Sequence, residues 1–389
     1  MKNRWSRYLI LLAVVTVAVA GGMTALNYIA DPYGIHHYGQ AGDWTKSRPS
    51  IRLLERLHKA HAIRDAKADT LLLGNSRVIV GLDPQHPSLP QPAYNLGLGA
   101  ANIYECQRYL QHAIHLHPPK LVIVAIDKGM FHAAAAPEGD FDEARLSVFA
   151  NGQPNTSWQR VDVPDTLFSL NAVLASATTL AARGPRVTYA HGLRDEALMR
   201  PYLSTAKVLV ENERWKAMSR KFEMLDASGQ NAQFAAFRTI LRVCAGAGID
   251  VRVFTNPLHA GMLEIEYGDG RDFEAWLRQV AAVVAEESAT NRREIPFWNF
   301  YGYNSITTEP FPDKSQPRST LQNYWEISHY RKPIGDLVLS RVMGHSDPRL
   351  DAMPDFGHRV TAETVGQDLQ RIAAERAQWR QTEPGASQP

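Results

Sequence analysis

Short, continuously apolar segments that alternate with helical patterns are the feature that most limits the folds open to this chain. The strongest of these segments is Lys120-Leu-Val-Ile-Val-Ala-Ile126. Strands of this kind are buried on both faces, which is typical of a parallel sheet with helices on each side. The sequence therefore predicts an α/β domain with three layers, α/β/α.

The expected elements follow this alternation. We expect strands at 70–73, 94–96, 120–126, 250–255 and 297–300. Helices are expected at 51–66, 101–116, 231–247, 271–287, 334–342 and 361–381. Residues 132–235 interrupt the pattern with helical periodicity, including a helix that Asp165 can cap and another at 206–224, which predicts a mostly helical insertion. The domain is then expected to cover 67–382, after a connecting segment at 31–66 and before a disordered tail at 383–389.

An uncharged run from Tyr8 to Ala30 follows three basic residues near the N-terminus. As a helix it would extend roughly 30 Å, enough to cross the hydrocarbon core of a bilayer. The basic residues favour a cytoplasmic N-terminus, so residues 1–30 are expected to form a cytoplasmic end and a single membrane anchor in the inner (cytoplasmic) membrane. The alternative is a signal peptide cleaved after Ala18-Val-Ala20. Either interpretation places the domain in the periplasm or outside the cell.

Composition narrows the function classes. The net charge is only +2 and no nucleic-acid motif is present, so nucleic acid is not an expected partner. Cys106 and Cys244 lie on apolar faces of expected helices and are interpreted as buried thiols. No metal or other cofactor is expected, because the following histidines lack acidic or cysteine partners at a recognised ligand spacing: 36, 37, 58, 61, 112, 115 and 117.

Three residues from two distant parts of the sequence have the chemistry of a serine nucleophile and its activating partners. Ser76 follows an apolar strand, at the carboxyl end where ligands bind in open α/β sheets. His329 can take the serine proton, and Glu326 can orient the imidazole and stabilise its protonated form. A turn serine, a surface acid and a helix-capping histidine are the structural alternative. Together the three residues favour acyl transfer through a Ser-His-Glu triad.

Further polar residues are expected near this site because they also follow strand ends. The N–H groups of Ser76, Gly97 and Gly99 are candidate oxyanion donors, with a tight turn as the alternative for the glycines. Asp127 cannot donate when ionised, so we expect it to orient loops or to pair with Lys128 or Arg77. The candidate pocket residues are Asn75, Arg77, Asn102, Asp127, Asn256, His259 and Trp325. A helix start is the alternative role for Asn102, a structural role for His259 and core packing for Trp325.

Together these residues resemble the SGNH (GDSL-like) hydrolase superfamily, especially its membrane-anchored envelope branch. That branch includes the D-alanyl transfer protein of teichoic acid modification and the alginate O-acetylation proteins. The resemblance covers about residues 67–131 and 245–344. It implies a flavodoxin-like SGNH-type domain in which Ser76 is the nucleophile, Gly97 or Gly99 supplies an oxyanion N–H, and Glu326 and His329 form the acid and base of the closing block.

The resemblance also implies a function. We expect an extracytoplasmic serine esterase or O-acyltransferase, most readily an O-acetyltransferase, that acts on envelope or exported carbohydrate. The expected partners are a glycan ester, the membrane through residues 8–30 and a multispanning membrane acyltransferase.

Three positions depart from the family pattern. Gly74-Asn75-Ser76 replaces Gly-Asp-Ser, Glu326 replaces an aspartate, and Asp127 stands where an asparagine is expected. The last change removes a side-chain oxyanion donor. The alternative function is therefore a catalytically silent carbohydrate-binding or scaffolding protein of an envelope polysaccharide assembly.

Overall fold

The computed structural model describes residues 2–37, 47–182, 189–218, 222–311, 315 and 320–382. The expected disordered tail at 383–389 lies outside these residues. By its internal contacts the chain divides into two units, residues 1–65 with 140–188 and residues 66–139 with 189–389. The expected insertion at 132–235 is therefore shared between the units, and the connecting segment at 31–66 belongs almost entirely to the first unit.

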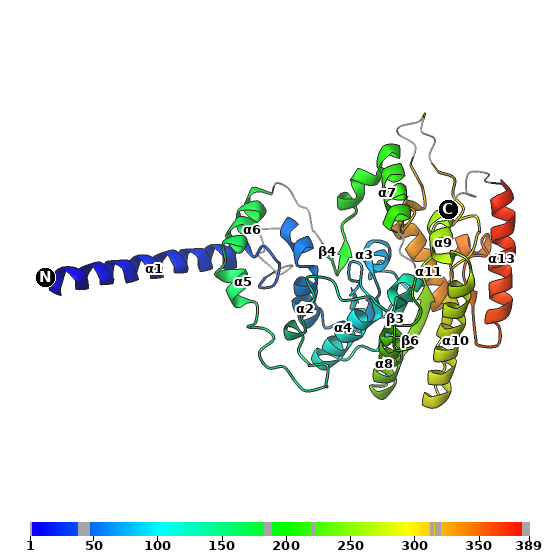
Figure 1. Ribbon diagram of the computed structural model, residues 1–389, viewed down its shortest axis with the longest axis horizontal. Coiled ribbons are helices and arrows are strands. Elements are labelled where there is room, and N and C mark those ends of the chain that lie inside the picture. Colours follow the sequence, from blue (N-terminus) through cyan, green and yellow to red (C-terminus); the bar gives the residue numbers. More distant parts are fainter. Residues whose placement is uncertain are drawn as a thin grey trace. The chain divides into compact units, whose positions relative to one another are not determined.

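A six-stranded sheet forms the core of the second unit (Figure 1), in the order β10-β7-β6-β3-β1-β2. Its strands are β1 Thr70–Leu73, β2 Ala93–Asn95, β3 Leu121–Ile126, β6 Asp250–Thr255, β7 Phe297–Asn299 and β10 His358–Arg359. Every neighbouring pair is parallel except β10 with β7. The predicted α/β class with a mostly parallel sheet is confirmed. The antiparallel edge strand β10 was not expected, because two residues are too few to show a periodicity.

The strand order determines where a ligand site can form. The five parallel strands, taken in chain order, lie 2-1-3-4-5 across the sheet, which is a doubly wound order. The connection from β1 leads to β2 on one side, whereas β3, β6 and β7 continue on the other side. A crevice opens at such a switch point, outside the carboxyl ends of the strands. Ser76 and Asp127 follow β1 and β3, the two strands beside it.

Helices cover both faces of the sheet, because successive strand side chains point to opposite faces and every β3 residue is buried. Ile123 of β3 belongs to a core cluster with Ile334, Leu337 and Val338 of α11 and Val78 of α3. α8 packs against β6 of the sheet and against the neighbouring helices α4 and α10. The helices of this unit are α3 Ser76–Gly81, α4 Ile103–Leu116, η2 Lys128–Phe131, η4 Glu196–Tyr202, α7 Thr205–Met218, α8 Ala232–Gly246, α9 Ala260–Tyr267, α10 Arg271–Asn291, α11 Lys332–Met343, α12 Pro348–Asp351 and α13 Val365–Thr382.

Two short hairpins complete the second unit. β4 Tyr189–Ala190 pairs with β5 Leu193–Arg194, and β8 Tyr324–Glu326 pairs with β9 His329–Tyr330. The second hairpin lies in the segment before Lys332, where the sequence predicted no strand. Its turn residues Ile327 and Ser328 are buried, so tertiary contacts rather than a periodic pattern define the hairpin.

The first unit contains the long apolar helix α1, Lys2–Ala30. Its stretch Arg4–Ala30 contains an 18-residue window with a mean hydropathy of 2.4 and is long and apolar enough to cross a membrane. A signal sequence meets the same criteria, so α1 is consistent with a single-pass membrane protein or a secreted one. The other helices of this unit are η1 Pro49–Leu53, α2 Glu55–Ala66, η3 Glu143–Arg145, α5 Val163–Leu167 and α6 Leu170–Ala181.

Two glycines bring α3 and α11 into backbone contact. A Cβ on Gly335 of α11 would lie 1.8 Å from the Gly81 carbonyl oxygen of α3. A Cβ on Gly81 would lie 2.1 Å from the Tyr330 ring. Because Ser76 begins α3 and α11 follows His329 closely, this contact sets the separation of the two elements that carry these side chains.

We expect Gly335→Ala to lower the free energy of unfolding by about 2 to 3 kcal/mol, because the added methyl group meets backbone that cannot rotate away. Unfolding of the detergent-solubilised full chain, followed by tryptophan fluorescence, measures the loss. The matched control is Gly246→Ala in α8, where a Cβ has no neighbour within 4 Å. Equal stability of the two variants would show that α3 and α11 do not touch as described.

Candidate active site

Ser76 lies at the turn between β1 and α3. Gly74 allows this turn, because a Cβ there would lie 2.6 Å from Val78 and 2.9 Å from the Ala125 carbonyl oxygen. Asn75 is the N-cap of α3, and its side chain accepts a hydrogen bond of 3.0 Å from the Arg77 N–H. Ser76 is therefore the first residue of a short helix, at the carboxyl end of the strand.

Ser76, His329 and Glu326 form a continuous hydrogen-bonded chain. Ser76 Oγ lies 2.8 Å from His329 Nε2, and His329 Nδ1 is hydrogen-bonded to the Glu326 carboxylate. In the neutral ring, a proton on Nδ1 donates to Glu326 and leaves Nε2 free to accept from the serine hydroxyl. The structure thus brings together the three residues of the predicted triad from α3, β8 and β9, in the arrangement that a serine nucleophile requires.

Glu326 is the buried end of this hydrogen-bonded series, whereas His329 reaches the surface. The His329 side chain is 15% exposed and that of Glu326 is 2% exposed. Burial raises the pKa of Glu326, but the His329 charge and hydrogen bonds from His329 and the Ser328 N–H outweigh it, so the pKa lies below its ordinary value. Glu326 therefore remains ionised and can stabilise a protonated His329.

Arg77 connects the turn of Ser76 to the hairpin that carries Glu326 and His329. Its Nε donates to the Ser328 carbonyl oxygen over 3.0 Å, and its Nη2 donates to Ser328 Oγ over 2.9 Å. Ser328 lies in the turn between Glu326 and His329. The residue that follows Ser76 in sequence therefore holds the β8–β9 turn, and the planar guanidinium suits such a two-bond contact.

Asp127 balances the buried charge of Arg77. Its Oδ2 accepts from Arg77 over 2.7 Å and from the Asn75 and Asn256 amides over 2.8 Å each, while Tyr301 donates to its Oδ1. Burial disfavours the Arg77 charge, yet Asp127 raises the pKa of Arg77 above its ordinary value. Of the two partners expected for Asp127, the structure selects Arg77.

The candidate oxyanion donors are not equivalent. Among the described residues no acceptor is present for the Ser76 N–H, which leaves it available. The Gly97 N–H instead donates to Asn95 Oδ1 over 3.0 Å, which corrects the expectation for Gly97. Gly97 is needed for another reason, because a Cβ there would lie 2.9 Å from the Ile79 backbone nitrogen in α3. Gly99 is partly exposed and stays a candidate donor.

Three candidate pocket residues have structural roles. Asn102 is the N-cap of α4 and forms a capping box with Glu105. His259 is the N-cap of α9; its Nδ1 accepts from the Gly261 N–H over 3.0 Å and its Nε2–H donates to the Glu309 carbonyl oxygen over 2.7 Å. Trp325 is buried in a small apolar cluster. Asn102 and His259 therefore cap helices and Trp325 packs in the core, as the alternative interpretations of these residues predicted.

Several residues of the site had no sequence signal. The Trp215 ring of α7 lies 6.2 Å from the His329 ring, centroid to centroid. Tyr330 donates to Asn256 Oδ1 over 3.0 Å, so both ends of the Asn256 amide are occupied. Ser328 is the anchor for Arg77. Trp215, Tyr330 and Ser328 do not follow a predicted strand end, which is why strand-end reasoning did not find them.

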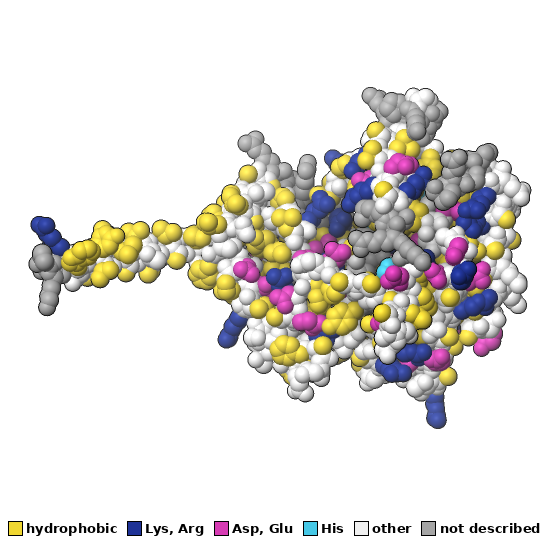
Figure 2. Space-filling model, in the orientation of Figure 1, with side chains coloured by type: hydrophobic (Ala, Val, Ile, Leu, Met, Phe, Trp, Pro, Cys, Tyr) yellow, Lys and Arg dark blue, Asp and Glu magenta, His cyan; other side chains and the backbone are white. Residues whose placement is uncertain are grey.

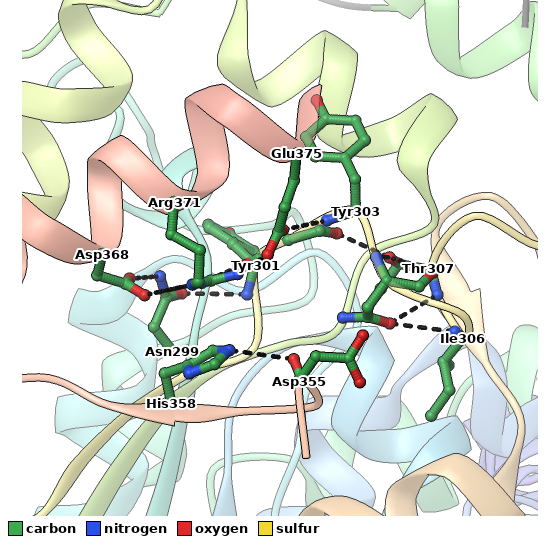
Figure 3. Close-up of polar contacts among 12 residues, drawn as sticks. Asn299, Tyr301, Tyr303, Ile306, Thr307, Asp355, His358, Asp368, Arg371 and Glu375 are labelled. Carbon is green, nitrogen blue, oxygen red and sulfur yellow. Dashed lines mark hydrogen bonds and ion pairs between the residues drawn. The ribbon is translucent and has the colours of Figure 1, made fainter. Parts of the chain in front are cut away.

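A second polar cluster lies at the end of β7, in the segment after Trp298 (Figure 3). Asn299 donates to Asp368 of α13, and Arg371 of the same helix donates to Asp368 and to the Tyr301 carbonyl oxygen. Glu375 accepts from the Tyr303 N–H over 2.8 Å. These contacts attach α13 to the segment that carries Tyr301, a hydrogen-bond donor to Asp127.

Comparison with protein-family models gave no match to this chain, and a search of curated proteins also gave none. Among the described residues, no group of three or more His, Cys, Asp or Glu side chains could hold a metal ion. Cys106 and Cys244 are buried and form no disulfide in the structure.

The Arg77–Asp127 pair generates a prediction. Asp127→Asn leaves a buried guanidinium without its counter-ion, so we expect the free energy of unfolding to fall by about 3 to 5 kcal/mol. Arg77→Met should cost a similar amount for the converse reason. The double variant should lose clearly less than the sum, because it leaves no unpaired charge.

Denaturant unfolding of the detergent-solubilised full chain measures these losses. The control is Lys120→Met, which removes an ion pair of 2.8 Å with Asp69 whose lysine is 73% exposed. That loss should stay below about 1 kcal/mol. Additive losses in the Arg77/Asp127 double variant would contradict the pairing.

His259 generates a pH prediction. Burial lowers the pKa of His259 from 6.5 to about 4, although the hydrogen bond to Glu309 opposes this shift. As the pH falls, the unfolded chain takes up the proton first, so stability present above pH 6.5 is lost toward pH 4. Between pH 7 and pH 5 this residue should account for a loss of about 2 kcal/mol.

His259→Asn keeps a side-chain acceptor for the Gly261 N–H but removes the titration. Between pH 7 and pH 5 we expect the free energy of unfolding of the variant to fall by about 2 kcal/mol less than that of the wild type. Denaturant unfolding at each pH measures both values. If the variant and the wild type lose the same free energy of unfolding between pH 7 and pH 5, His259 is not buried in its neutral form.

Proposed function

We propose that this protein is an extracytoplasmic serine esterase or O-acyltransferase of the SGNH type. The hydrogen-bonded chain from Ser76 through His329 to Glu326, at the switch point of a doubly wound sheet, is the observation that carries the proposal. The flavodoxin-like strand order agrees with the family that the sequence resembles.

The first half of the reaction forms an acyl-enzyme. Ser76 Oγ attacks the carbonyl carbon of an acyl ester while His329 Nε2 takes the hydroxyl proton. The Ser76 N–H, with Gly99 as the second candidate, stabilises the negative charge that develops on the carbonyl oxygen. When the carbon–oxygen bond to the leaving alcohol breaks, His329 returns the proton to that alcohol, and Glu326 stabilises the protonated ring in between.

The second half consumes the acyl-enzyme. An acceptor hydroxyl loses its proton to His329 and attacks the same carbonyl carbon, and the proton then returns to Ser76 as its ester bond breaks. Hydrolysis results when the acceptor is water, and transfer results when it is a sugar hydroxyl. A membrane anchor would keep the site close to envelope glycans or to a multispanning acyl donor, which favours O-acyl transfer, most readily of acetyl groups, to envelope or exported carbohydrate.

One observation favours the alternative of a silent carbohydrate-binding or scaffolding protein. The amides of Asn75 and Asn256 each donate one hydrogen bond to Asp127, which directs both side chains toward that carboxylate. Stabilisation of the intermediate would therefore rest mainly on backbone N–H groups, which predicts a slow enzyme.

Activity toward a short-chain aryl ester separates the two functions. We expect the detergent-solubilised full chain to react with a fluorophosphonate probe and to hydrolyse p-nitrophenyl acetate. Ser76→Ala and His329→Ala should each lower kcat/KM by about a thousandfold. Glu326→Gln should lower kcat/KM by about a hundredfold. The double Ser76/His329 variant should resemble either single variant, because the two side chains act as a unit.

Ser228→Ala is the matched control, since Ser228 lies in an exposed turn and should leave the rate unchanged. Wild-type turnover by Ser76→Ala would refute the triad. A folded wild-type protein that shows neither labelling nor turnover would favour the binding function.

A further inference from the structure

The first unit exposes an unusual amount of apolar surface next to α1. α5 and α6 lie beside the C-terminal part of this helix (Figure 1). Leu170, Leu174 and Leu180 of α6, with Phe168 just before it, are each between 42% and 74% exposed. No charged residue occurs from 166 to 182. An aqueous surface rarely presents so many large apolar side chains together.

The contacts with α1 show at which depth of a bilayer the apolar surface of α6 and Phe168 would lie. The uncharged run 8–30 is about 34 Å long as a helix, slightly more than a hydrocarbon core of about 30 Å. Asn27 lies near its outer end and contacts Ser176 of α6. Phe168 borders an open apolar groove of about 540 Å³ whose other walls are α1 residues between Val17 and Tyr28. Phe168 and the first turn of α6 therefore lie beside α1 residues that a membrane would surround.

The side chains of Asn27, Thr24 and Ser169 at this contact are satisfied inside the protein, as hydrocarbon requires. Asn27 is fully buried; its amide donates to the Leu167 carbonyl oxygen over 3.0 Å and accepts from Ser176 Oγ over 2.8 Å. Thr24 donates to the carbonyl oxygen of Ala20 in its own helix. Ser169 caps α6 by accepting from the Ala172 N–H. The turn between α5 and α6 is thus compatible with a lipid environment.

We propose that α6 and Phe168 insert their exposed apolar side into the extracytoplasmic leaflet of the bilayer that α1 spans, with lipid acyl chains as the occupant. At 12 residues α6 is about 18 Å long, too short to span but suited to an interfacial helix. Figure 2 shows hydrophobic side chains along α1 that continue over α5 and α6. The proposal rests on an uncleaved α1 and is independent of the proposed chemistry.

Quenching by spin-labelled lipid tests this contact. Full-length Leu174→Cys carries a bimane probe and is reconstituted in phosphatidylcholine vesicles that contain lipid with a nitroxide on the acyl chain. Leu170→Cys serves as the second variant in case Leu174→Cys does not fold. The control is Thr290→Cys in α10, an exposed polar position, and labelled wild-type protein gives the background from the buried Cys106 and Cys244.

We expect the nitroxide lipid to remove most of the emission from positions 174 and 170 and little from position 290, while aqueous iodide does the reverse. Quenching by iodide but not by lipid at position 174 would overturn the proposal. Energy transfer between labelled copies without lipid quenching would also overturn it, in favour of a second copy of the chain. A mature protein that begins at Gly21 would overturn it by removing the span.

Discussion

The ion pair between Arg77 and Asp127 is the interaction on which the arrangement of the site depends. Both charges are buried, so each needs the other and a full set of hydrogen bonds to remain in the core. Asp127 follows β3, Arg77 follows β1, and the Asn256 amide reaches Asp127 from the end of β6. Through Ser328, Arg77 also holds the hairpin of Glu326 and His329. One buried charge pair thereby joins three strand ends to a hairpin whose Ser328 lies 251 residues beyond Arg77.

This network gives a physical reason for two differences between this chain and the SGNH pattern that its sequence resembles. The pattern places a carboxylate before the nucleophile and an amide after the third strand. Here Asn75 and Asp127 exchange these groups, and the Asn75 amide donates to the Asp127 carboxylate over 2.8 Å. The two substitutions therefore compensate each other as donor and acceptor. The exchange also moves the carboxylate beside Arg77, whose contact with Ser328 holds the turn between acid and base.

The two units differ in how their apolar surface is covered. In the second unit, α3 and α11 pack so closely that Gly81 and Gly335 touch, which leaves the triad on a rigid framework. In the first unit, α6 buries one side against α1 and leaves the other side exposed. A membrane that covers this side would support the unit at two places, the span and the interfacial helix, and so restrict its rotation about α1.

Features that depend on local pattern follow from the amino-acid sequence alone. Continuous apolar segments predicted the parallel strands, and position at strand ends singled out Ser76 and Asp127, because the carboxyl ends of parallel strands meet at one edge. Residue chemistry alone paired Ser76 with Glu326 and His329. These inferences need only neighbours in sequence or the known reactivity of side chains.

Folding selects which of several compatible roles each polar residue takes. Gly97 had the features of an oxyanion donor, but its N–H is bound by Asn95; His259 and Asn102 had the features of pocket residues, but they cap helices. Trp215 reaches His329 from α7, a contact that no spacing encodes. A hydrogen-bonding group has few partners in the folded chain and many along the sequence, so its role is decided by which partners folding brings within about 3 Å.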